Sequence, residues 1–151
     1  MKITLAAIVP RRARSKNDAT ERLFDDYLAR AARYNPTASQ LFDSEPALLA
    51  WLSTQPGRTV PFLILLDSAG QLLSSEDLAA LLKRHRDEAT QHLVLAIGPA
   101  DGWSAAARAR ASLLFSLGRI TLPHQLARVV LAEQTYRALT ILAGHPYHSG
   151  H

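Results

Sequence analysis

Short apolar runs alternate with amphipathic stretches along this chain. Residues 2–9, 60–66 and 92–97 are apolar almost throughout. Continuous apolar runs of this length are typical of strands that are covered on both faces. Residues 37–42 and 113–117 carry weaker strand patterns. We therefore expect a sheet built mainly from fully buried strands.

Between the apolar runs, residues that cap helices precede apolar positions at helical spacing. Asn17 or Asp18 is expected to cap a helix to about residue 33 with a buried face formed by Leu23, Phe24, Tyr27, Leu28 and Ala31. Further helices are expected after Ser44 (to about residue 54), after Ser74 with Asp77 as a capping box (to about 88), after Ser104, and over residues 124–143 before Gly144. Strands that alternate with helices predict a three-layer α/β sandwich with a mainly parallel sheet, formed by residues 1–151 as a single domain.

The helix expected over residues 124–143 is apolar on most of its surface. One side carries Leu126, Val129, Val130, Tyr136 and Leu139, and another carries Leu131, Ala138 and Leu142. A helix of this kind must be buried on most of its surface. We expect one side to pack against a second copy of the chain in a homodimer. The alternative is a helix at the centre of the monomer's own core.

Composition narrows the class of protein. The absence of cysteine excludes disulfides, thiolate metal sites and a cysteine nucleophile. A net charge of +4 and a pI of about 9.9 suit a polyanionic partner such as RNA, or simply a solvated basic surface. The apolar run at residues 3–9 is short, ends at Pro10 and precedes its basic cluster (residues 11–16), unlike a secretory signal. We expect a cytoplasmic protein without a membrane span.

Three expected loops are candidates for a ligand site. Ligands bind parallel sheets at the carboxyl ends of the strands, and residues 66–70, 98–102 and 117–123 follow strands there. Their glycines permit close backbone approach, which suits an adenosine-bearing ligand. No dinucleotide fingerprint, phosphate-binding P-loop or serine-hydrolase elbow occurs. The tail histidines His145, His148 and His151 are spaced like metal ligands, but Pro146 and the lack of a nearby carboxylate argue against a metal site. A frayed chain end with surface histidines is the simpler explanation.

The last third of the chain resembles the ribosomal RNA large subunit methyltransferase H family, which belongs to the SPOUT class. The resemblance lies in SLGRITLPHQ (residues 116–125), RVVLAEQTYRA (128–138) and HPYH (145–148). Thinner matches at residues 1–9, 65–67, 74–79 and 97–98 extend the resemblance over most of the chain. It implies an α/β fold whose C-terminal segment forms a trefoil knot, and a homodimer with the knot helix at its interface. The implied reaction is S-adenosylmethionine-dependent N3-methylation of a pseudouridine in 23S rRNA within the ribosome.

The resemblance also implies roles for individual residues. The cofactor contacts are Leu66, Gly98, Leu117, Gly118, Arg119, Ile120, Thr121 and Leu122. The residues toward the RNA are Arg137, Tyr147 and His148, which we take as the catalytic candidates. His148 is the candidate base for the N3 proton and Tyr147 a stacking or orienting group. Arg137 stabilises developing negative charge or holds a phosphate, unless it only pairs with Glu133 one helical turn earlier.

Two positions depart from the family pattern. The family usually has two glycines in the loop at 98–99, where this chain has Pro99 after Gly98. Proline has no backbone N–H to offer a cofactor. A basic residue often follows the Tyr-His pair, where this chain continues Ser149-Gly150-His151, and the cluster at residues 11–16 is a candidate replacement. These departures motivate an alternative function, a knotted RNA-binding module without catalysis.

Overall fold

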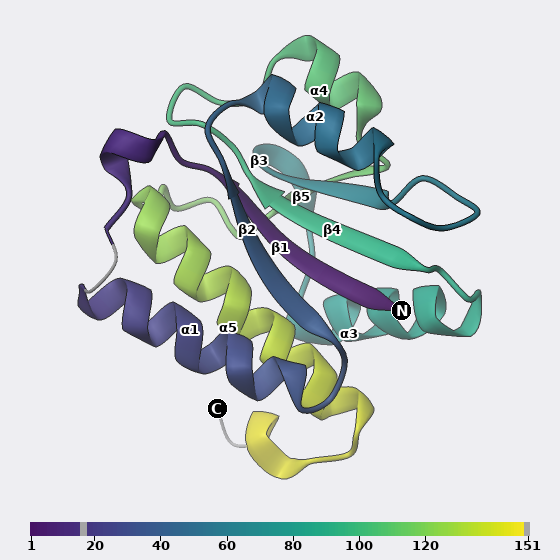
Figure 1. The fold of residues 1–151 in the computed structure, drawn as a ribbon. Coiled ribbons are helices and arrows are strands. Elements are labelled where there is room, and N and C mark those ends of the chain that lie inside the picture. The colour runs from purple at the N-terminus through teal and green to yellow at the C-terminus, as the bar shows by residue number, and fades with distance from the viewer. Residues whose placement is uncertain (16–17, 150–151) are drawn as a thin grey trace.

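The computed structural model describes residues 1–15 and 18–149. The chain forms three layers, one sheet between two layers of helices. Five strands pair in the order β2-β1-β4-β3-β5, and every pairing is parallel. Helices cover both faces (Figure 1), which confirms the predicted α/β fold with a parallel sheet. The strands are β1 (Lys2–Ile8), β2 (Thr37–Phe42), β3 (Phe62–Leu72), β4 (His92–Ile97) and β5 (Leu113–Ser116).

The helices divide between the two faces of the sheet (Figure 1). On one face lie α1 (Ala19–Ala32), α3 (Ser75–Asp87) and α5 (His124–Leu142), and on the other lie α2 (Glu45–Ser53) and α4 (Ala105–Arg110). Two short 3-10 helices, η1 (Arg11–Ala13) and η2 (Pro146–His148), follow β1 and α5. Among the described residues, no helix is both long and apolar enough to cross a lipid bilayer.

The predicted caps are present where the structure describes them. Asp18 accepts a hydrogen bond from the backbone of Glu21, while Asn17, the other candidate, lies outside the described residues. Ser74 and Asp77 form the reciprocal capping box at the start of α3. Satisfying the free N–H groups at a helix start is what makes these short polar residues informative in sequence.

The third strand differs from its prediction at both ends. Val60 is exposed and β3 begins at Phe62, because Pro61 has no N–H to donate to a ladder. Residues 66–70, which were predicted to form a loop, are instead part of a strand that runs to Leu72. Its ladder with β5 is interrupted after Leu66 and resumes at Gln71, so the polar residues between lie in a bulge rather than a chain reversal.

One residue of the predicted buried face of α1 was placed wrongly. Leu23 is 45% exposed, whereas Phe24 and Ala31 are buried and Tyr27 and Leu28 are partly buried. Positions 24, 27, 28 and 31 form the narrow stripe that faces α5, and residue 23 lies about 100° around the helix from the first of them. The stripe is therefore narrower than the sequence pattern indicated.

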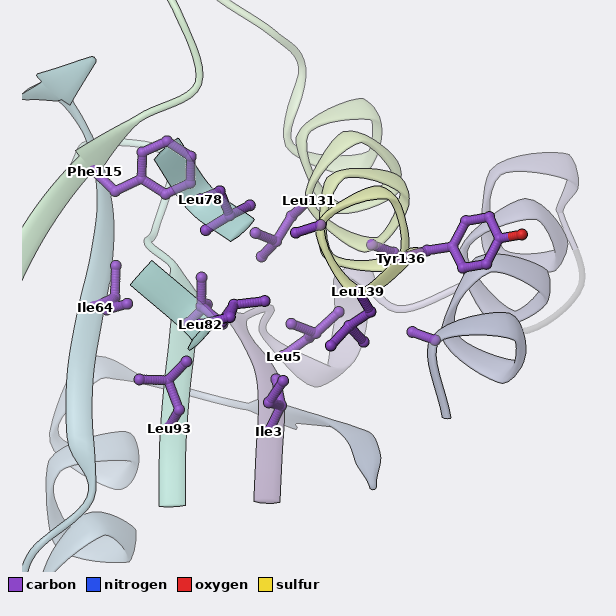
Figure 2. Packing of buried hydrophobic residues seen from close by; sticks show 14 of the residues in the cluster. Ile3, Leu5, Ile64, Leu78, Leu82, Leu93, Phe115, Leu131, Tyr136 and Leu139 are labelled. Carbon is purple, nitrogen blue, oxygen red and sulfur yellow. The ribbon is translucent and has the colours of Figure 1, made fainter. Parts of the chain in front are cut away.

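The apolar surface of α5 is largely covered within the monomer. Leu131 and Leu139 point toward the strands, and Tyr136 points toward α1 (Figure 2). The Tyr136 ring lies 6.2 Å from that of Tyr27, and α3 packs along a further side. The monomer core thus accounts for much of the pattern from which a dimer was expected, but Leu126 is 44% exposed.

Buried histidines make the stability of this fold depend on pH. Burial lowers the pKa of His85, His92 and His124 from the usual value near 6.5. The unfolded chain therefore binds protons more readily than the folded one below about pH 6.5, and the free energy of unfolding is full above that pH and falls below it. We predict a lower urea midpoint at pH 5.5 than at pH 7.5, with a loss of at most about 1.4 kcal/mol per pH unit for each imidazole.

The variant His85→Gln tests the cause. It removes an imidazole whose Nδ1 lies 2.8 Å from the hydroxyl of Thr90 and whose Nε2 has no partner. The variant should unfold with a shallower pH dependence than the wild type over this interval, which lies above the range where carboxylates titrate. A wild-type midpoint that does not change between pH 7.5 and 5.5 would contradict the prediction.

Candidate functional site

A cavity of about 500 Å³ lies beside the bulge of β3 and at the carboxyl ends of β4 and β5. The bulge and the loops that follow β4 and β5 surround it, close to where a ligand site is expected in a parallel sheet. Its wall includes every residue predicted to contact a cofactor: Leu66, Gly98, Leu117, Gly118, Arg119, Ile120, Thr121 and Leu122. Residues more than fifty positions apart in sequence are therefore brought into one wall.

The floor of the cavity depends on a close approach between β3 and β5. A Cβ atom added to Gly70 would lie 2.7 Å from the carbonyl carbon of Leu114 and from the nitrogen of Phe115. Only glycine fits where two backbones touch in this way. Phe115 is the ladder partner of both Leu66 and Gln71, so the chain between them arches past β5.

Trp103 forms a wall of the cavity that sequence reasoning missed. Its ring packs against Gly98, where a Cβ would lie 2.7 Å from the ring atom Cε2. Its Nε1–H donates to the carbonyl of Leu66 over 2.9 Å. The indole thus ties the loop after β4 to β3 at the start of its bulge. The sequence did contain one signal, a tryptophan in a loop rich in glycine and proline. A large ring at such a place is usually buried with a hydrogen-bond partner for its N–H.

A second missed contact holds the same edge of the site. The Asp67 side chain is 4% exposed and accepts a hydrogen bond from the backbone of Ala69 over 2.8 Å. Its other oxygen lies 3.0 Å from Nε of Arg108 on α4, which is 48% exposed. A buried carboxylate needs such partners. The pair therefore stabilises the bulge of β3 beside the cavity.

The loop at residues 117–122 offers its main chain to the cavity. Gly118 has φ +141°, which favours glycine, and its N–H donates to the hydroxyl of Ser116 over 3.2 Å. None of the N–H groups of residues 119–122 donates a hydrogen bond within the described part of the chain. Apolar side chains, including Leu66, Leu117 and Leu122, stand beside these groups. This combination of backbone donors and aliphatic walls suits a flat, hydrogen-bonding ring such as adenine.

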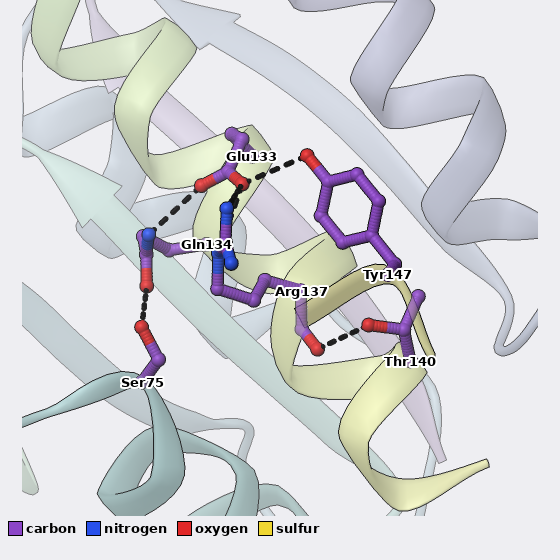
Figure 3. Close-up of polar contacts among 6 residues, drawn as sticks. All are labelled: Ser75, Glu133, Gln134, Arg137, Thr140 and Tyr147. Carbon is purple, nitrogen blue, oxygen red and sulfur yellow. Dashed lines mark hydrogen bonds and ion pairs between the residues drawn. The ribbon is translucent and has the colours of Figure 1, made fainter. Parts of the chain in front are cut away.

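The three catalytic candidates lie elsewhere, at the C-terminal end of α5. Arg137 contacts Glu133 through Nε at 3.0 Å and Nη2 at 2.7 Å, and Tyr147 donates to the same carboxylate oxygen over 3.0 Å. Gln134 continues this network to Ser75 of α3 (Figure 3). Nδ1 of His148 lies 3.1 Å from the carbonyl oxygen of His145. Glu133 is thus the centre of a cluster in which the structural role weighed for Arg137 is present.

Burial and hydrogen bonding shift two pKa values in this cluster. Burial, together with the bond to Glu133, raises the pKa of Tyr147 well above its usual range. The hydrogen bond to Glu133 raises the pKa of Arg137. At neutral pH the phenol therefore keeps its proton and donates it, and the guanidinium stays charged 5.0 Å from the centre of the Tyr147 ring.

The cofactor candidates and the catalytic candidates are separated by the length of α5. The cavity borders His124, the first residue of the helix, and Arg137 lies thirteen residues further on (137 − 124). At 1.5 Å per residue this is about 20 Å along the axis. One protomer therefore does not bring the two groups together.

The sequence predicted that the tail histidines do not form a metal site. Within residues 1–15 and 18–149, no group of three or more histidine and acidic side chains is placed to hold a metal ion. His151, the last of the three spaced histidines, and Gly150 lie outside the described residues, as does Lys16 of the basic cluster.

Comparison with known proteins gives consistent relatives. The family model described as "Predicted SPOUT methyltransferase" matches residues 1–148. A protein of Koribacter versatilis (strain Ellin345), named "Ribosomal RNA large subunit methyltransferase H", is 49% identical over 138 residues, which cover 91% of this chain and 94% of the relative. A protein of Brucella ovis with the same name is 56% identical over 86 residues, 57% of this chain and 51% of the relative.

Among solved structures, the SpoU methyltransferase AviRb from Streptomyces viridochromogenes in complex with AdoMet matches with a TM-score of 0.49 and 14% identity. The match covers 95% of this chain and 58% of AviRb. The family model spans nearly the whole chain, and the relative from Koribacter versatilis matches along nearly its own whole length. This chain belongs to the SPOUT methyltransferase family.

Proposed function

We propose that this methyltransferase uses S-adenosylmethionine to methylate N3 of a pseudouridine in the 23S rRNA of the large ribosomal subunit. The observation that carries the proposal is the single cavity that all eight candidate cofactor residues line. Family membership supports methyl transfer, and the name of the relative that is 49% identical supports ribosomal RNA as the substrate. Such a substrate implies that the protein acts in the cytoplasm.

The cavity has the donors and walls that the cofactor needs. The free N–H groups of residues 119–122 are available to the adenine edge, and leucine side chains to its faces. Pro99 also lines the cavity and has no backbone N–H to donate. The N–H groups of Gly98 and of residues 119–122 can donate to the cofactor in its place. When bound, S-adenosylmethionine supplies a methyl group on a positively charged sulfur. The protein's part is to hold the acceptor nitrogen in line and to remove its proton.

A homodimer would complete the site. If α5 packs antiparallel to its copy about a two-fold axis, the cofactor cavity of one protomer meets the C-terminal end of α5 from the other. The separation of about 20 Å along one helix would then be spanned by the second chain. Ile120, 82% exposed, and Leu126, 44% exposed, provide apolar surface beside the cavity for this contact.

In this arrangement the three catalytic candidates act on the RNA at the partner's cavity. Arg137 would hold a phosphate or stabilise negative charge that develops on the base. Tyr147 would stack on or orient the base, and His148 would move a proton. The Glu133 network keeps the first two side chains in place before RNA arrives.

The proposed fold includes a trefoil knot formed by the C-terminal segment. Its support is the path of β5, whose backbone touches Gly70, and the packing of α5 against α3 immediately afterwards. Gln134 of α5 accepts a hydrogen bond from Ser75 over 2.6 Å. These contacts are those expected if the segment after β5 is threaded through a loop of the chain in the proposed knot.

The proposed methyl transfer can be tested directly. Large ribosomal subunits that lack the modification should take up labelled methyl groups from S-adenosylmethionine into 23S rRNA when the protein is added, and the product should be an N3-methylated pseudouridine by mass spectrometry. Subunits that already carry the modification are the control and should take up none. Tight cofactor binding without any transfer would contradict the proposal and favour an RNA-binding module without catalysis.

The contact between Gly98 and Trp103 in the cavity can be tested by substitution. Gly98→Ala places a methyl group 2.7 Å from the Trp103 ring, which must move and release the carbonyl of Leu66. We expect calorimetry to give an affinity for S-adenosylhomocysteine at least about tenfold weaker, or about 1.4 kcal/mol. Gly57→Ala is the control, because a Cβ there would also meet a side chain, that of Gln91 at 2.5 Å, but at the opposite end of the sheet from the cavity. Equal affinities for Gly98→Ala and wild type would refute this role.

Heterodimers isolated with two affinity tags test whether each active site is shared between two chains. One protomer carries Gly98→Val and the other His148→Ala, so a site shared between chains survives once per dimer and should give about half the wild-type rate. The control heterodimer carries both substitutions in one protomer and none in the other. It should be inactive if sites are shared and half-active if each protomer acts alone, so the reverse pattern would overturn the proposal.

A further inference from the structure

A second, larger cavity of about 740 Å³ adjoins the cofactor cavity. It lies at the carboxyl ends of β1 and β2, between η1, α1 and the start of α5. The two cavities share three residues, Pro99, Ala100 and His124. A molecule in the outer cavity would therefore lie directly beside a ligand in the inner one, which is where a methyl acceptor must be.

His124 stands at this junction with an unused side chain. It is the first residue of α5, following Pro123. Its imidazole makes no hydrogen bond within the described part of the chain, and because Nε2 is buried, Nδ1 is the ring nitrogen that a ligand can reach. Burial, with the charge of Arg128 in second place, lowers its pKa, so the ring is neutral at pH 7 and free to accept a proton.

The wall of the outer cavity suits a neutral ring with polar edges. The Arg128 side chain is only 8% exposed, lies 2.7 Å from Glu21 and stacks over the Phe24 ring at 4.1 Å. Its remaining N–H groups can donate to carbonyl oxygens. Five carboxylates also line the cavity, against three arginines: Asp18, Glu21, Asp43, Glu45 and Asp101 against Arg12, Arg14 and Arg128. This excess repels phosphate, so a base and its ribose enter while phosphates stay outside, near the exposed Arg11.

We propose that the outer cavity receives the acceptor nucleoside and that His124 takes the proton from its N3. This inference rests on the proposed function and assigns the proton transfer to a group of the same protomer as the cofactor. His148 is confined to the opposite end of α5 in that protomer. This assignment replaces the proton transfer proposed above for His148, whose role at a partner's site is then to orient the RNA.

The chemical step balances without any further reactant. The N3–H bond breaks and the proton passes to the imidazole of His124, and N3 uses the electron pair to bond the methyl carbon. The carbon–sulfur bond breaks with its electrons on sulfur, which gives S-adenosylhomocysteine and the N3-methylated base. The imidazolium, beside the charge of Arg128, then releases its proton to water.

Steady-state kinetics on His124→Ala and His124→Gln tests the proton transfer. We expect kcat to fall at least about 100-fold in both. The KM for the ribosomal substrate and the calorimetric affinity for S-adenosylhomocysteine should change less than about threefold, because neither ligand is held mainly by this ring. A kcat that stays near the wild-type value in either variant would overturn the role of His124.

The cavity itself is tested by filling it. Ala13 lines the outer cavity from η1 and is exposed, so Ala13→Trp should raise the KM for the ribosomal substrate at least about tenfold and leave cofactor affinity unchanged. Ala109→Trp, on the exposed surface of α4 and away from both cavities, is the matched control and should change neither. Equal KM values for the two variants would contradict the assignment.

A binding readout is independent of activity. With histidine-¹⁵N-labelled protein saturated with S-adenosylhomocysteine, free pseudouridine should shift the imidazole signals of His124, identified by their loss in His124→Gln, and should not do so in Ala13→Trp. If the wild type transfers no methyl group but these shifts occur, the proposed reaction fails and the nucleoside site stands. If deletion of residues 145–151 moves the His124 signals and pseudouridine does not, the tail of a second copy occupies the cavity and this inference is wrong.

Discussion

The close contact between β3 and β5 at Gly70 is the constraint on which the site depends. Two backbones can touch there only because residue 70 has no side chain, since a Cβ would lie 2.7 Å from main-chain atoms of Leu114 and Phe115. This contact sets where β5 ends, and hence where the loop at residues 117–122 turns toward the ends of β3 and β4. The candidate cofactor cavity therefore depends on how closely the backbone of β3 passes that of β5, more than on any one side chain.

The helix that follows the loop inherits its surroundings from that path. Because α5 enters between α1 and α3, the sheet, α1 and α3 cover most of its circumference, and an almost uniformly apolar sequence is stable there. Its polar side chains are concentrated around Glu133, where Arg137, Gln134 and Tyr147 satisfy one another's hydrogen-bonding groups. That cluster folds η2 back against the helix and holds residues 146–148 in a defined place. Leu126 remains exposed.

The elements of the fold could be predicted because each rests on local chemistry. Caps such as Ser74 and continuous apolar runs such as β4 depend on a few neighbouring residues. The extension of β3 through Asp67 to Gly70 could not, because it depends on pairing with β5 that resumes at Gln71, between residues far apart in sequence. For the same reason Trp103 and the pair of Asp67 with Arg108 went unnoticed at the site. The candidate cofactor residues were named by resemblance, and the cavity adds the physical reason why they belong together.

Unsatisfied polar atoms identify function only when their surroundings do. His85 and His124 each bury an Nε2 without a partner, which folded proteins generally avoid. In His85 the other ring nitrogen bonds Thr90 and the ring packs on Phe62 at 4.1 Å, so the core accounts for the residue. His124 has no such partner and borders two connected cavities, one of them lined by the candidate cofactor residues. Its other ring nitrogen, Nδ1, is neither buried nor bonded where the two cavities meet, which is why the proposed chemistry is assigned to this imidazole and not to His85.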